Sequence, residues 1–151
     1  MSEVVDSAWR ENYKFIFSPQ QIAAYTGENR RRSFKALLND GKDIYVLTVD
    51  GMVSGVCAVQ TCEQEPFIGY AEIMLMYISP RFQGQGLGSR LLTHALNEIC
   101  KKGYIHAVLD TAEKNENARR FYEKLGFTEF KTDVSRKFDN VTRVIYTRQL
   151  L

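Results

Sequence analysis

The chain has 151 residues, of which 44% are hydrophobic and 25% charged, the composition of an ordinary globular protein, so we expect residues 1–151 to form a single domain. Its formal net charge of +2 is too small to indicate a nucleic-acid partner. No apolar run is long enough to span a bilayer and the N-terminal residues show no charged-then-apolar signal, so we expect a cytoplasmic protein with no membrane partner.

The first quarter of the chain is expected to be helical, over residues 3–40. Ser18, Pro19 and Gln21 form a helix start signal, with a capping serine, a proline in the first turn and a glutamine three residues after the cap. A further helix follows and ends near residues 39–41. Its expected inward face is apolar and consists of Phe34, Leu37 and Leu38.

The pattern then changes to that of β-strands. Residues 43–49 alternate, Asp50-Gly51 signals a hairpin, and residues 53–62 form the returning strand. A loop at 63–66 leads into a strand at 67–78. The chain is therefore expected to build its sheet from residue 43 onward.

The remaining elements are predicted to alternate between helix and strand. The helix over 87–101 is expected to turn one apolar face inward, made of Leu87, Leu91, Leu92, Ala95 and Ile99. A strand at 104–110 and a helix at 117–125 follow, and the last two strands, 127–134 and 141–149, are expected to pair antiparallel. Because a strand–helix–strand passage is a parallel crossover, the sheet should be mixed.

The most informative segment lies between the strand at 67–78 and the helix that follows. It contains Gln83, Gly84, Gly86 and Gly88, and glycines leave the backbone open to a ligand. Unpaired amides at a helix N-terminus favour phosphate groups. A Walker-type loop would need a lysine after the last glycine, and a dinucleotide fingerprint would need G-x-G-x-x-G, so neither pattern fits. The pattern that fits is Q-x-x-G-x-G.

A second motif follows downstream, N-x-x-A-x-x-F-Y-x-x-x-G-F, running from Asn115 to Phe127. With the loop, it resembles the GNAT superfamily of acyl-CoA-dependent N-acyltransferases, most strongly over residues 43–130. The resemblance implies a mixed α/β fold whose central, mostly antiparallel sheet contains one splayed parallel strand pair and is flanked by helices. That fold usually begins with a strand before its first helix, and whether this chain has one is open.

The resemblance also implies that acetyl-CoA is the acyl donor, without a metal. In the family, the main chain of the strand before the loop binds the pantetheine arm, the loop binds the diphosphate, and the asparagine of the second motif contacts the cofactor. Asn115 could equally cap a helix or turn. The matching residues are Met76, Tyr77, Ile78, Gln83, Gly84, Gln85, Gly86, Leu87, Gly88, Ser89 and Asn115.

By the same resemblance, Tyr122 is the general acid that protonates the departing thiolate. Glu72 and Asp110 each match a position where family members carry an acidic base, with Glu72 favoured and a water chain as a third option. The expected reaction is acetyl transfer to a primary amine by direct attack in a ternary complex. Fold analogy also places Trp9, Arg10 and Tyr13 of the first helix beside the acceptor.

Three alternatives were weighed. An acyl-cysteine route is disfavoured because Cys57, Cys62 and Cys100 lack an activating context, and their number and spacing indicate reduced thiols rather than disulfides or a metal site. A CoA-binding sensor without turnover is the main competing hypothesis. A nucleotide-binding α/β domain is disfavoured by the glycine spacing. The acceptor amine and the oligomeric state are open, with a homodimer as one option.

Overall fold

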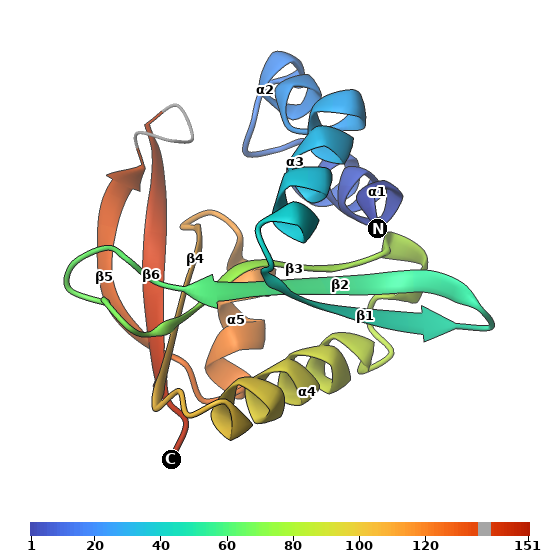
Figure 1. Cartoon of the computed structure of the whole chain (residues 1–151). Helices are drawn as coiled ribbons and strands as arrows, with labels where there is room; N and C mark the ends of the chain where they lie inside the picture. Colours follow the sequence, from blue (N-terminus) through green and yellow to red (C-terminus); the bar gives the residue numbers. More distant parts are fainter. Residues whose placement is uncertain (136–139) are drawn as a thin grey trace. The chain divides into compact units, whose positions relative to one another are not determined.

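The computed structural model describes residues 1–135 and 140–151. Its helices are α1 (Ser2–Asn12), α2 (Pro19–Ala24), α3 (Gly27–Asn39), α4 (Leu87–Lys101) and α5 (Glu116–Lys124), with a short 3₁₀ helix, η1 (Pro80–Phe82). Its strands are β1 (Asp43–Val49), β2 (Met52–Thr61), β3 (Ala71–Ile78), β4 (His106–Ala112), β5 (Thr128–Ser135) and β6 (Val141–Gln149). They form a sheet in the order β1-β2-β3-β4-β6-β5 (Figure 1).

The sheet is mixed, as predicted. The pairs β1–β2, β4–β6 and β5–β6 are antiparallel, and β3–β4 is parallel. In the part of the chain that the structure describes, no strand precedes α1. No helix there is both long and apolar enough to cross a membrane.

The chain divides into two compact units. Unit 1 comprises Met1–Gln60 and Met74–Ala95, and unit 2 comprises Thr61–Ile73 and Leu96–Leu151. The boundary runs through β3 and α4, so each of these elements contributes residues to both units. The glycine-rich loop belongs to unit 1, and the second motif belongs to unit 2.

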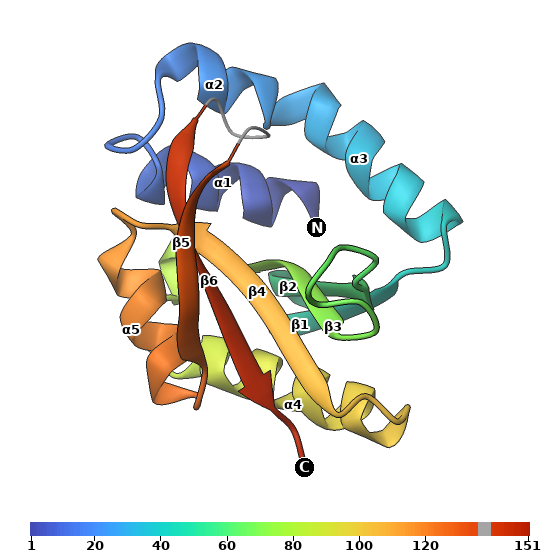
Figure 2. The same cartoon turned by 90° about the vertical axis from the view of Figure 1, so that its left-hand side faces the viewer.

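The helices of unit 1 form as predicted, with one correction. The Ser18 hydroxyl accepts the Gln21 N–H and the Gln21 side chain accepts the Ser18 N–H, which completes the capping box of α2. α1 packs against α3 (Figure 2). On the expected apolar face of α3 only Phe34 is buried, and Leu38 is 56% exposed. The predicted helix is confirmed, but fewer of its apolar residues are buried than the sequence pattern indicates.

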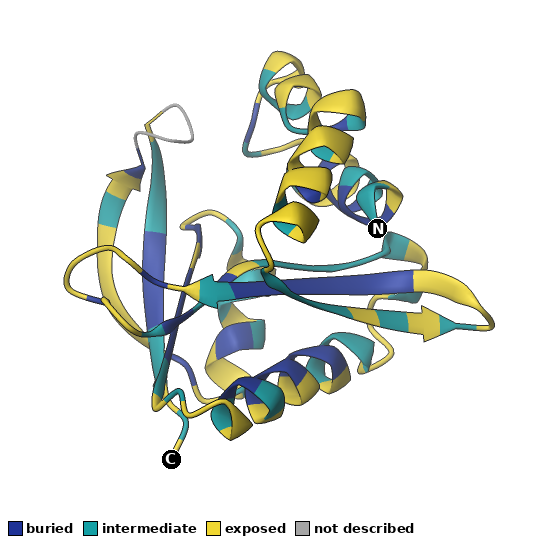
Figure 3. Ribbon diagram, viewed as in Figure 1, coloured by how far each residue is buried: buried dark blue, intermediate teal, exposed yellow. Residues whose placement is uncertain are grey.

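The hairpin of unit 1 also forms as predicted. Asp50 and Gly51 both have positive φ, as a tight hairpin turn requires, and the middle of β2 is buried (Figure 3). Gly55 in β2 is needed for close packing, because a Cβ there would lie 2.5 Å from Ile78 Cδ1 and 3.1 Å from Leu91 Cδ2. The absence of a side chain at Gly55 therefore lets Ile78, at the end of β3, and Leu91, in α4, pack closely against β2.

Unit 2 corrects two of the predicted strand starts. β3 begins at Ala71 rather than residue 67, because the chain turns through Phe67–Tyr70 and Gly69 N–H donates to Cys62 O. Phe67 is buried in a core cluster with Cys62, Val108 and Ile145. β4 begins at His106 rather than residue 104, and Ile105 is 52% exposed just ahead of it. In both places the residues just before the strand are apolar, as strand residues are, so the sequence pattern placed the start of the strand too early.

The C-terminal part of unit 2 matches the prediction closely. β5 and β6 pair antiparallel, and the centre of β6 is buried at Val144, Ile145 and Tyr146. α5 ends just before Gly126, whose φ of +81° explains the glycine there. The prediction for α4, which contributes residues to both units, is also largely confirmed. Leu91, Leu92, Ala95 and Ile99 are buried, as expected, whereas Leu87 is only partly buried.

Candidate active site

The glycine-rich loop of unit 1 connects β3, through η1, to α4. Gly84 and Gly86 have φ of +73° and +74°, a region that other residues rarely adopt. A Cβ built at either glycine would have no described atom within 4 Å. The conformation therefore requires glycine, and it leaves one side of the backbone open.

The amides of this loop are available for an anion. Gln83 N–H donates to Pro80 O, and the first bond of α4 runs from Arg90 N–H to Gly86 O. Between them, no backbone hydrogen bond joins the Gly84, Gln85 or Gly86 N–H to a carbonyl in the described part of the chain. The first-turn amides of α4 have no acceptor within the helix. Together these donors can bind phosphate oxygens.

Two glutamine side chains hold the loop in place. Gln83 Nε2 donates to the carbonyl of Ile78 at 3.0 Å, and Gln85 Nε2 donates to that of Arg81 at 3.3 Å. The first bond ties the loop directly to the last residue of β3. The glutamine of the motif thus has a structural reason to be there, because it closes the turn between strand and loop.

The predicted pantetheine-binding strand is anchored from α1. Trp9 Nε1 donates to the Tyr77 hydroxyl at 2.9 Å, and Met76, Tyr77 and Ile78 are all partly buried. Trp9 is only 3% exposed and stacks on Tyr13 with ring centroids 4.8 Å apart. Sequence analogy placed Trp9 beside the acceptor, whereas the structure makes it a core residue that joins α1 to β3.

In unit 2, Glu72 and Asp110 lie on neighbouring strands. The parallel ladder pairs Glu72 with Val108, two residues before Asp110. Glu72 is partly buried close to Cys62, and burial together with the charge of Glu72 raises the pKa of the Cys62 thiol. The pairing confirms the parallel crossover that the sequence predicts and brings the two carboxylate positions near each other.

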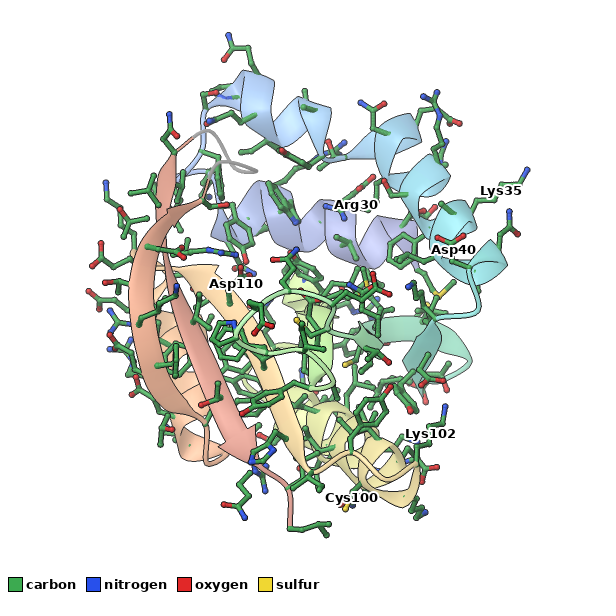
Figure 4. All side chains as sticks on the ribbon, turned by 60° about the vertical axis from the view of Figure 1, so that its left-hand side comes forward. Arg30, Lys35, Asp40, Cys100, Lys102 and Asp110 are labelled. Atoms are coloured by element: carbon green, nitrogen blue, oxygen red, sulfur yellow. The ribbon has the colours of Figure 1, made fainter. Side chains whose placement is uncertain are left out.

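Asp110 is held by a cation that sequence reasoning missed. The Arg143 guanidinium donates through Nη1 to Asp110 and through Nε to Asp133, the latter at 2.6 Å. Figure 4 labels Asp110 on β4, while Arg143 and Asp133 come from β6 and β5. Arg143 lowers the pKa of Asp133, chiefly by hydrogen bonding. No local motif signals this network, because its members are brought together by strand pairing.

Tyr122 lies on α5 and is 8% exposed. Its ring packs against those of Phe121, Phe127 and Tyr146, with centroids 5.2, 6.0 and 6.4 Å away. At the start of the same helix, Asn115 Oδ1 accepts the Ala118 N–H at 3.2 Å. Of the two roles weighed for Asn115, the structure shows the helix cap.

The described cysteines lack the features of a nucleophile. Burial raises the pKa of the Cys57 thiol to about 12, so almost none of it is thiolate at neutral pH. Cys62 is also buried, and Cys100 lies partly exposed in the last turn of α4. Among the described residues, no group of three or more His, Cys, Asp or Glu side chains could hold a metal ion.

The comparisons with known proteins agree with this arrangement. The family described as Acetyltransferase (GNAT) family matches residues 3–127, which is most of the chain. The chain is 31% identical over 114 residues to the [Ribosomal protein bS18]-alanine N-acetyltransferase of Escherichia coli (strain K12), covering 71% of this chain and 74% of that one. It is also 31% identical over 128 residues to Acetyltransferase Atu2258 of Agrobacterium fabrum, covering 85% and 82%. This protein belongs to the GNAT acetyltransferase family and is an acyltransferase.

A solved structure supports the same fold. The PaiA N-acetyltransferase of Thermoplasma acidophilum, crystallised in complex with coenzyme A, superposes with a TM-score of 0.73 over 97% of this chain and 89% of that one. Its sequence identity of 21% makes this a likeness of fold. The resemblance drawn from the loop and the second motif is confirmed at the level of family and fold.

Proposed function

We propose that this protein transfers an acetyl group from acetyl-CoA to a primary amine by direct attack while both substrates are bound. The observation that carries the proposal is the loop from Gln83 to Gly86, where positive-φ glycines present backbone N–H groups with no described backbone acceptor. Phosphate groups, including a diphosphate, are ligands that such donors, backed by a helix N-terminus, can bind. The coenzyme A held by a structural relative makes acetyl-CoA the natural donor.

We assign the acetyl-CoA contacts residue by residue. The main chain of Met76, Tyr77 and Ile78 binds the pantetheine arm, and residues 83–89 bind the diphosphate. The Ile78 carbonyl already accepts from Gln83, so the remaining main-chain groups of the strand supply these bonds. The Asn115 cap leaves the amide nitrogen of that side chain as the group for a cofactor contact.

The proton transfers follow from the chemistry of a thioester and an ammonium group. An amine with a pKa near 10 must lose a proton before its lone pair can attack the carbonyl carbon. We assign that step to Glu72, directly or through water, because it matches the position at which family members that use a strand glutamate carry this residue. The C–N bond forms, the C–S bond breaks, and Tyr122 gives its proton to the departing thiolate. We place this activity in the cytoplasm.

The competing proposal, a CoA sensor without turnover, is separated by one experiment. The purified protein is incubated with acetyl-CoA and a panel of amines, including a peptide with an N-terminal alanine and a polyamine, and free CoA is measured with a thiol reagent. Amine-dependent release of CoA supports the acetyltransferase. Thermal protection by acetyl-CoA without release by any amine supports the sensor, and protection by NAD but not by acetyl-CoA contradicts both.

A further inference from the structure

A hydrogen-bonded network holds α5 against β6 in unit 2. Tyr146, in the middle of β6, is fully buried. Its hydroxyl accepts a hydrogen bond from Arg119 Nε at 3.1 Å and donates one to Glu123 Oε1 at 2.8 Å. Arg119 and Glu123 are four residues apart and so lie on the same side of α5. Tyr146 on β6 is thus hydrogen-bonded to two residues on one side of α5.

Arg119 extends the same network to neighbouring segments. Its Nη1 donates to the carbonyl of Glu113 before the helix, and its Nη2 donates to the carboxylate of Glu129 on β5, each at 3.4 Å. The hydrogen bond that Arg119 donates to Tyr146, together with the charges of Glu129 and Glu123, raises the pKa of the Arg119 guanidinium and so favours its charged form. Each of the three nitrogens of the guanidinium thus donates one hydrogen bond to a neighbouring segment.

The network lies beside Tyr122 on the same helix. Tyr122 is the residue immediately before Glu123, and its ring centroid lies 6.4 Å from that of Tyr146. A rotation of α5 about its axis would move the Tyr122 hydroxyl sideways, and the two bonds of Tyr146 oppose such a rotation. Misplacing a reacting group by about 1 Å can cost on the order of a hundredfold in rate.

We infer that Tyr146 is a positioning residue for Tyr122: its bonds to α5 fix the rotation of the helix and thereby the direction of the catalytic hydroxyl. The inference rests on the proposed function, since it assumes that Tyr122 is the general acid. Tyr146 itself acts through the helix and donates no proton to the leaving group. Its hydroxyl is already committed to Glu123.

The test is a double-mutant cycle on kcat. Tyr146→Phe keeps the buried ring and removes both bonds, so we expect kcat to fall at least about tenfold with the Kd for acetyl-CoA nearly unchanged. In a Tyr122→Phe background the same substitution should change kcat by less than about twofold, because the group it positions is gone. An equal loss in both backgrounds would overturn the inference and leave the proposed function standing. If Tyr122→Phe alone leaves kcat unchanged, the proposed acid itself is rejected.

Matched variants keep the test independent of folding. Glu123→Gln retains an oxygen that can accept from Tyr146 and should keep most of the activity, whereas Glu123→Leu removes the acceptor and should resemble Tyr146→Phe. Tyr104→Phe is the control, since its hydroxyl is hydrogen-bonded to Thr61, which belongs to the same unit and lies outside α5. A loss of kcat in Tyr104→Phe equal to that in Tyr146→Phe would show a general response to losing a tyrosine hydroxyl and would overturn the inference.

Discussion

The Arg143 guanidinium on β6 donates a hydrogen bond to the Asp110 carboxylate on β4. Asp110 is one of the two carboxylates that the sequence left as competing bases, and the other, Glu72, lies on the neighbouring strand β3. Glu72 is the candidate that the family resemblance favours, and substitutions of the two residues can be compared directly.

Glu72→Gln should lower kcat by about a hundredfold or more near neutral pH, the usual range for losing a general base. Raising the pH should recover part of that loss, because the acceptor amine then loses its proton to solvent. Asp110→Asn should change kcat by only about two- to threefold, and the loss of its partly exposed ion pair should cost about 0.5–1 kcal/mol of unfolding free energy. The measurements are kcat against pH and thermal unfolding of both variants. A larger kcat loss in Asp110→Asn than in Glu72→Gln would reverse the assignment.

Tyr122→Phe should lower kcat by about a hundredfold or more while leaving the acetyl-CoA affinity nearly unchanged. The substitution keeps the ring that packs against Phe127 and Tyr146, so the helix should remain in place. Steady-state kinetics and calorimetric binding of acetyl-CoA provide the two quantities. A large loss of affinity would instead assign Tyr122 a structural role.

Gly86→Val should abolish acetyl-CoA binding. The valine side chain would occupy the open side of the loop, where we place the diphosphate, and its positive φ adds a backbone cost of about 1–2 kcal/mol. Gly51→Val is the matched control, since Gly51 has φ of +76°, lies in unit 1 and also faces open space. Calorimetry should detect acetyl-CoA binding by the control alone. Binding by Gly86→Val would reject the placement of the diphosphate.

Acid should weaken the ion pair of Asp133 with Arg143. Because Arg143 lowers the Asp133 pKa in the folded state, the pair stabilises the protein fully above the unfolded pKa of about 3.9. That contribution is lost as the pH falls through the lower folded pKa. Asp133→Asn should therefore have a lower Tm than the parent protein at pH 6, and the two Tm values should converge toward pH 2. A constant difference across this range would contradict the prediction, and Glu65→Gln, in an exposed loop of the same unit, serves as the control.

The sequence predicted the order of the elements because the signals that specify them are local. The capping box at Ser18, the hairpin turn at Asp50 and the helix stop at Gly126 each depend on a few adjacent residues. The errors occurred where burial, rather than propensity, decides the boundary. Phe67 has the composition of a strand residue, yet its side chain enters the core from a turn.

For the candidate site, the sequence by itself determined the family and located the glycine-rich loop, because two spaced motifs encode a backbone conformation and a helix start directly. Only the tertiary structure decided which side chains are already committed to partners. Arg143 reaches Asp110 and Asp133, and Tyr146 reaches Arg119, across strands and a helix that are distant in the chain. Such pairings depend on strand order and register, which no local pattern in a single sequence specifies.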